Sequence, residues 1–159
     1  SIMASEIKVD TIFNAGGDND TGIDLATNDQ ILLKVANATK LTMNSTGQTT
    51  IVGEGGTTTT SLQQGLNKVW CKTNAAGTSI EDSSNVSSLT DTGTGKQTVN
   101  INNDMANITF APLLTYIDNQ TDMTPWIDDI TTGKYMCSSY HSGAYVDNKF
   151  ASCVNGDLA

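Results

Sequence analysis

Acidic side chains gather between residues 118 and 129, where they are the groups best suited to catalysis. Asp118, Asp122, Asp128 and Asp129 all fall in this segment. Glycoside cleavage uses two carboxyl groups, one as an acid and the other as a nucleophile or base. A polysaccharide depolymerase using Asp128 or Asp129 is therefore one hypothesis. We favour the alternative, in which these are solvated side chains of a polar loop, and we expect no enzymatic activity.

The single histidine offers little for nucleophilic catalysis. A Ser-His-Asp arrangement would require His141, beside Ser142, to meet a carboxylate distant in the sequence. The chain also has no nucleophile-elbow, phosphate-loop, zinc-protease or dinucleotide-binding motif. We expect neither a catalytic residue nor a cofactor.

The three cysteines do not form a metal-binding pattern. Cys71, Cys137 and Cys153 show no C-x-x-C spacing, and a structural zinc ion usually takes four Cys or His ligands. No metal is therefore expected. Cys137 and Cys153 could pair if their strands are neighbours, or all three could be free thiols as in a reducing cytoplasm.

Aromatic side chains are the strongest candidates for ligand contact. Aromatic rings stack on sugars and combine an apolar body with a polar edge. Trp126 follows Pro125 in a polar stretch that we expect to be a loop, and loops frequently carry recognition. The alternative is that the rings fill a core, as we expect for Trp70. The candidate receptor or glycan contacts, in segments 118–130 and 138–148 and just before them, are Tyr116, Trp126, Tyr140, His141 and Tyr145.

Short runs between residues 22 and 53 alternate between apolar and polar side chains. This period of two predicts strands with one apolar face, and each run is too short to cover that face within one chain. Association of identical chains would cover it. The candidate residues of a trimer interface are Ile23, Leu25, Ile31, Leu33, Val35, Leu41, Met43 and Ile51.

Charge and hydropathy narrow the classes of partner. The net charge is −9, and the lysines stand singly, whereas binding to nucleic acid requires clustered cations. No apolar run is long enough to span a membrane, so membrane insertion is not expected. No signal peptide opens the sequence, which disfavours a secreted bacterial sugar-binding module.

The pattern of turns and strands predicts an all-β protein in two parts. Residues 4–60 are expected to form an N-terminal shaft, with a polar linker over 54–65, and residues 66–159 an antiparallel β-sandwich. The shaft begins with a strand within 4–14. The strands expected in the second part cover 68–73, 85–90, 97–103, 108–117, 134–140 and 145–154.

One block of the second part resembles a module of bacteriophage tail fibres, notably those of marine phages. The resemblance is specific over residues 68–107 and fades after about Tyr116. Residues 3–12 also look like the start of such proteins, and residues 31–47 are similar to fibre shaft repeats. The segments that carry the main resemblance are 68–72 (KVWCK), 85–95 (NVSSLTDTGTG), 98–101 (TVNI) and 105–107 (MAN).

The resemblance implies a homotrimeric fibre of the virion, with an intertwined trimeric β shaft and a β-sandwich head. Its partners would be two further copies of the chain, other virion proteins, and a host surface glycan or protein. The alternative functions are a capsid decoration fibre and, from another class, a tailspike-like polysaccharide depolymerase.

Overall fold

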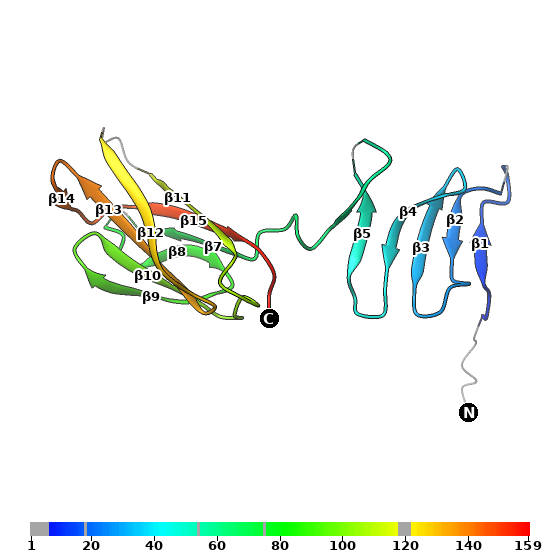
Figure 1. Ribbon diagram of the computed structural model, residues 1–159, viewed down its shortest axis with the longest axis horizontal. Helices are drawn as coiled ribbons and strands as arrows, with labels where there is room; N and C mark the ends of the chain where they lie inside the picture. The colour runs from blue at the N-terminus through cyan, green and yellow to red at the C-terminus, as the bar shows by residue number, and fades with distance from the viewer. Residues whose placement is uncertain (1–6, 18, 54, 75, 118–121) are drawn as a thin grey trace, which may run out of the picture. The chain divides into compact units, whose positions relative to one another are not determined.

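A computed structural model of the chain describes residues 7–17, 19–53, 55–74, 76–117 and 122–159 (Figure 1). Every regular secondary-structure element of these residues is a β-strand, and every strand pairing is antiparallel. The prediction of an all-β fold is thereby confirmed. Across these ranges, no helix is long and apolar enough to cross a membrane. The chain divides into two compact units, Ser1–Gly65 and Leu66–Ala159, called here the first and second unit.

The first unit is one antiparallel sheet whose strands follow one another in chain order. Its strands are β1 (Thr11–Phe13), β2 (Gly22–Asp24), β3 (Ile31–Val35), β4 (Ala38–Met43), β5 (Thr49–Val52) and β6 (Thr59–Ser61). The short strands expected between residues 22 and 53 are therefore confirmed. All buried hydrophobic side chains among the described residues belong to the second unit, so this sheet has no core of its own.

Local turn chemistry sets the connections in this sheet. Ala36 and Asn37 join β3 to β4 with φ values of 52° and 58°, the left-handed pair that suits the twist of a two-residue hairpin. In the next turn, the side-chain oxygen of Asn44 accepts the backbone N–H of Gln48 at 2.9 Å. Gly47 supplies the positive φ of 77° that this turn needs.

Two expectations for the first unit are wrong in detail. The predicted linker over 54–65 contains β6, because its threonines suit a pleated edge strand and pair with β5. Gln63 fastens that edge, since its side chain accepts the N–H of Thr49 at 3.0 Å and donates to the Gly47 carbonyl at 2.9 Å. Within the described part of 4–14, only β1 is a strand.

The second unit contains two antiparallel sheets. The four-stranded sheet has the order β11-β15-β7-β8, and the five-stranded sheet has the order β12-β13-β10-β9 with β14 paired to β13. The strands are β7 (Val69–Thr73), β8 (Ile80–Ser84), β9 (Val86–Gly93), β10 (Lys96–Ile101), β11 (Ala111–Tyr116), β12 (Met123–Thr131), β13 (Lys134–His141), β14 (Ala144–Tyr145) and β15 (Phe150–Asn155).

Asn85 marks the point where the chain passes from one sheet to the other. It separates β8 from β9 and has a φ of 56°, in the left-handed region that asparagine tolerates better than most residues. Its side-chain oxygen accepts the backbone N–H of Asn103 at 2.7 Å, and its amide donates to the Lys68 carbonyl at 3.1 Å. One side chain thus fixes the corner to two other segments.

The core of the second unit lies between the inner faces of its two sheets. Tyr135 and Phe150 are its largest members, and both have no exposed surface. The Tyr135 hydroxyl and Ser152 Oγ, from opposite sheets, form a buried hydrogen bond of 2.8 Å. Burial raises the pKa of Tyr135. The buried apolar residues are Val69, Cys71, Val99, Ile101, Met105, Phe110, Tyr135, Cys137, Phe150 and Val154.

All three cysteines are free thiols. Cys71 and Cys137 are buried in the core, where burial raises the pKa of both and brings that of Cys71 to about 11. Cys153 alternates with the buried Ser152 and Val154, so it lies on the outer face of its sheet. The Cys137–Cys153 pairing left open by the sequence is not formed.

Two expectations for the second unit are wrong. Trp70 was expected in the core, but Val69 and Cys71 take the inner positions of β7, and Trp70 therefore lies on the outer face. The segment expected to be a loop from 118 to 130 contains β12, which pairs with β13 from Met123 onward. Residues 118–121 lie outside the described residues.

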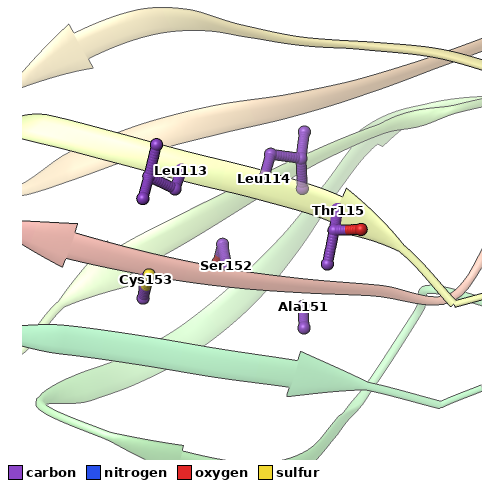
Figure 2. A pocket seen from close by; sticks show the side chains of 6 residues that line it. All are labelled: Leu113, Leu114, Thr115, Ala151, Ser152 and Cys153. Carbon is purple, nitrogen blue, oxygen red and sulfur yellow. The ribbon is translucent and has the colours of Figure 1, made fainter.

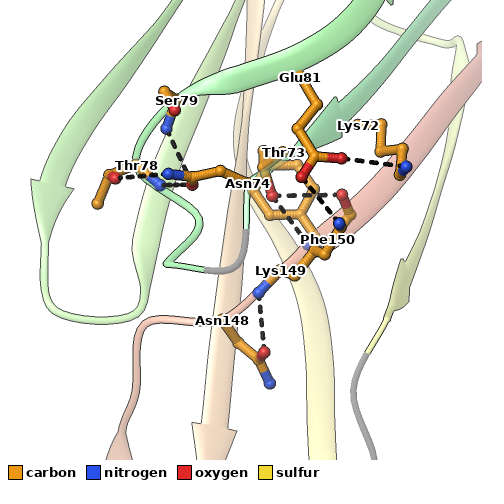
Figure 3. A network of polar contacts seen from close by, with 9 residues as sticks. All are labelled: Lys72, Thr73, Asn74, Thr78, Ser79, Glu81, Asn148, Lys149 and Phe150. Carbon is orange, nitrogen blue, oxygen red and sulfur yellow. Dashed lines mark hydrogen bonds and ion pairs between the residues drawn. The ribbon is translucent and has the colours of Figure 1, made fainter.

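A polar network joins the β7–β8 hairpin to the start of β15 (Figure 3). The Glu81 carboxylate pairs with Lys149 at 2.9 Å and with Lys72 at 3.0 Å, and these hydrogen bonds lower the pKa of Glu81. Deeper in, the Phe150 N–H donates to Thr73 Oγ1 at 2.9 Å. Exposed ion pairs contribute little stability, so the buried Thr73 contact is the stronger constraint on register.

Candidate functional site

Three aromatic rings meet on the outer face of the five-stranded sheet. The ring centroids of Trp126 and Tyr140 are 5.9 Å apart, those of Trp126 and Tyr145 5.8 Å, and those of Tyr140 and Tyr145 5.3 Å. Both pairs that include Tyr145 are close to edge-on, a favourable ring geometry. None of the three rings belongs to the buried core. We call these rings together with Lys96 the aromatic surface.

Strand alternation explains why these side chains share a face. Tyr135 and Cys137 occupy inner positions of β13, so Ser138 and Tyr140 face outward. Trp126 lies opposite Ser138 in the register, and Tyr145 lies opposite Tyr140. Three strands, β12, β13 and β14, each contribute one ring.

Lys96 brings a positive charge to the same face. Lys96 is on β10 and lies opposite Ser138 of β13. Its Nζ is 4.4 Å from the centroid of the Tyr145 ring. This distance is within the range of a cation–π interaction. Ser138 Oγ, between Lys96 and Trp126 in the register, is buried and has no hydrogen-bond partner.

The two aspartates considered for glycoside cleavage have polar partners. The Trp126 Nε1–H donates to Asp128 Oδ2 at 2.8 Å, and Lys134 forms an ion pair with Asp129. Both carboxylates are exposed, whereas the general acid of a glycosidase is usually sheltered from water. Asp118 lies outside the described residues.

The structure brings together three of the five candidate contact residues and separates the other two. Tyr116 packs against the core, where its hydroxyl donates to the Ser138 carbonyl and burial raises its pKa to about 12. His141 neighbours Tyr140 on β13 and therefore points to the other face. Its Nε2 lies 3.3 Å from Ser142 Oγ.

Lys96 was not identified from the sequence. Nothing in its immediate neighbours distinguishes it from the other isolated lysines. Its position beside Tyr145 depends on the pairing of β10 and β14 with the same strand, β13. Only the cross-strand register, which links residues distant in the sequence, could have revealed it.

The candidate interface residues of the first unit lie on one face of its sheet. Register aligns Ile23, Leu33, Leu41 and Ile51 across four strands, and period-two alternation adds the others. The most exposed side chains on this face have between 37 % and 52 % of their surface exposed. We call this the apolar face: Ile12, Ile23, Leu25, Ile31, Leu33, Val35, Leu41, Met43 and Ile51.

The opposite face of the same sheet is more polar, although Phe13, Leu32 and Val52 also lie on it. Lys34 and Asp24 form an ion pair of 2.6 Å there, and the hydrogen bond from Lys34 lowers the pKa of Asp24. Thr42 lies opposite Thr50 on the same side. This face therefore carries charged and hydroxyl groups that water can solvate, whereas the apolar face exposes contiguous hydrocarbon.

The outer face of the four-stranded sheet carries a shallow apolar pocket of about 210 Å³ (Figure 2). Leu113, which is 59 % exposed, lies opposite Cys153, and Cys153 lies opposite Trp70. The residues that line the pocket are Leu113, Leu114, Thr115, Ala151, Ser152 and Cys153. None is charged, so the pocket offers apolar contact and no acid–base chemistry.

Comparison of the chain with protein-family models, with curated proteins and with solved structures gave no match.

Proposed function

We propose that this chain is a structural and adhesive protein of a virion, a homotrimeric fibre whose first unit is an assembly segment. In this proposal the second unit is a β-sandwich head that contacts the host surface. The observation that carries the proposal is the apolar face, a row of aliphatic side chains on a sheet that has no core of its own. The resemblance of residues 68–107 to phage tail-fibre modules supports the same function.

Burial of the apolar face is the physical reason for assembly. Each square ångström of apolar surface removed from water contributes about 25 cal/mol. Hydrogen bonds of the central strands are completed within one chain, so copies can associate through side chains. Three copies around one axis would shelter three apolar faces and leave the polar faces, with the Asp24–Lys34 pair, in water.

The aromatic surface is the proposed contact with the host. It combines ring faces with polar neighbours on a regular sheet, as sugar-binding surfaces do. Three copies per fibre would add avidity to a weak single contact.

Substitution of Trp126 by alanine tests this assignment. We expect the fluorescently labelled full chain to bind host cells at least about tenfold more weakly, because a central aromatic residue commonly carries most of the contact energy. The melting temperature should change much less than for a core substitution, since Trp126 is not in the buried core. The measurement is binding to cells by flow cytometry, with thermal unfolding in parallel.

Trp70→Ala is the matched control, because Trp70 lies on the outer face of the other sheet. It should leave binding to cells within about twofold of the unsubstituted protein. Equal binding by the Trp126→Ala protein and the unsubstituted protein would contradict the assignment of the aromatic surface to host contact.

A further inference from the structure

We infer that the aromatic surface binds an acidic pyranose, with the sugar ring against Tyr145 and Trp126 and its acidic group on the Lys96 ammonium. This inference rests on the proposed function and names the chemical class of the ligand. The sugars in question carry a carboxylate, as hexuronic acids do, or a sulfate.

The ammonium of Lys96 is unusual in the second unit. The other lysines of this unit have oxygen partners: Lys72 and Lys149 pair with Glu81, Lys134 pairs with Asp129, and Lys68 donates to the Leu66 carbonyl. Lys96 instead lies over the Tyr145 ring. Among the described residues of this unit, Lys96 is the lysine whose ammonium lies over an aromatic face.

A cation held over a ring can still bind an anion. The lysine ammonium has three N–H donors, and the ring interacts with its charge without accepting a strong hydrogen bond. A carboxylate or sulfate placed beside Tyr145 can accept from those donors in a charge-assisted hydrogen bond. The ring that orients Lys96 is the same ring on which the sugar can stack. A single monosaccharide unit can therefore make both contacts.

Other ligand classes fit this surface less well. A quaternary ammonium would meet the charge of Lys96 at the Tyr145 ring. A nucleic acid requires several clustered cations, and the chain has a net charge of −9. A neutral sugar could accept a hydrogen bond from the ammonium through a hydroxyl oxygen, but it would gain no charge pairing.

Asp128 and Asp147, which follow Trp126 and Tyr145 by two residues, each accept hydrogen bonds from the protein. Asp147 Oδ1 accepts the Gly95 N–H at 2.6 Å and a Gln97 Nε2–H at 3.3 Å. Asp128 accepts the Trp126 indole N–H and lies opposite Met136. Tyr140 lies on the other side of Trp126 along the strands, opposite Thr124.

Ser138 lies beneath the same surface and has no exposed area. Its hydroxyl is buried without a partner between Lys96 and Trp126 in the register. A buried hydroxyl without a hydrogen bond is destabilising. A sugar could bond to this hydroxyl only after the side chains that cover it move.

The test compares acidic oligosaccharides with neutral counterparts of the same backbone. The probes are tetragalacturonate and tetramannuronate, each with its methyl ester, and a sulfated cellotetraose with unsulfated cellotetraose. Affinities for the full chain are measured by isothermal titration calorimetry. We expect at least one acid form to bind about tenfold more tightly than its neutral counterpart, and the arm in which it does so identifies the acid.

Substitutions at Lys96 test whether this residue causes the preference for the acid form. Lys96→Gln should remove it, and Lys96→Arg should retain it. Lys134→Gln, which removes a lysine already paired with Asp129, should leave it unchanged. The inference is overturned if no acid form binds better than its neutral counterpart, or if Lys96→Gln keeps the preference.

The same variants separate this inference from the proposed function. If Trp126→Ala abolishes binding to cells and Lys96→Gln does not affect it, the proposed function stands and the acidic ligand is wrong. If acidic sugars bind through Lys96 but the protein does not attach to host cells, the ligand class stands and the adhesive function is wrong.

Discussion

Replacing Leu33 with aspartate is expected to convert the proposed trimer into monomers at micromolar concentration. Leu33 lies in the middle of the apolar face, between Ile23 and Leu41 on the neighbouring strands. At a three-fold interface the substitution would place three carboxylates in an apolar environment without partners. An unpaired buried charge costs several kcal/mol, and each chain would contribute one. Sedimentation velocity measures the outcome directly.

The matched control is Thr42→Asp, on the polar face of the same sheet. Thr42 lies opposite Leu32 and Thr50, on the side that carries the Asp24–Lys34 pair. A carboxylate at this position remains in water, so the assembly should keep its mass. If both variants dissociate equally, or if neither does, the apolar face is not the interface.

Replacing Phe150 with alanine should destabilise the second unit by about 3–5 kcal/mol. Phe150 has no exposed surface and begins β15, which lies between β11 and β7. Alanine would leave a cavity between the two sheets that rigid strands cannot easily close. The melting transition of this unit should fall by about 15 °C or more. Calorimetry or the near-ultraviolet signal of the buried Tyr135 records it.

Leu113→Ala serves as the control for that experiment. Leu113 is a large aliphatic residue of the same sheet, but it is 59 % exposed on the outer face. Its truncation should change the unfolding free energy by no more than about 0.5 kcal/mol. A loss for Leu113→Ala as large as that for Phe150→Ala would mean that the core does not lie between the inner faces.

The strands of the first unit were predictable because one physical signal dominates there. Between residues 22 and 53, apolar side chains recur at alternate positions and Asn and Gly separate the strands; β6, which has no apolar residue, was missed. In the second unit, β12 escaped detection because Pro125 and two aspartates interrupt its pattern. Proline is tolerated at the edge of a sheet, and β12 is an edge strand.

The inward or outward direction of single residues was harder to predict than the strands. Trp70 was expected in the core because it is large and lies on a strand, but Val69 and Cys71 set the phase of β7. Tyr116 and Trp126 are both aromatic, and only the tertiary arrangement shows that one packs inward and the other outward. Hydrophobicity predicts that one face of a strand is buried. It does not predict whether a large residue or its two neighbours in the sequence lie on that face.

The aromatic surface was predictable in part for the same reason. Tyr140 and Tyr145 are close in the sequence and joined by a tight turn, so their proximity is local information. Lys96 reaches them through pairing between β10 and β13. Such pairing depends on register across a long sequence separation, which neither composition nor periodicity specifies.

The mass of the intact chain in solution tests the central claim most directly. Three chains of 16.8 kDa each should sediment as one particle at micromolar concentration. The mass should stay constant on tenfold dilution, and a fragment that begins at Gly65 should dissociate more readily. A stable species of 16.8 kDa for the intact chain would contradict the account, because its apolar face would then be stable in water without a partner.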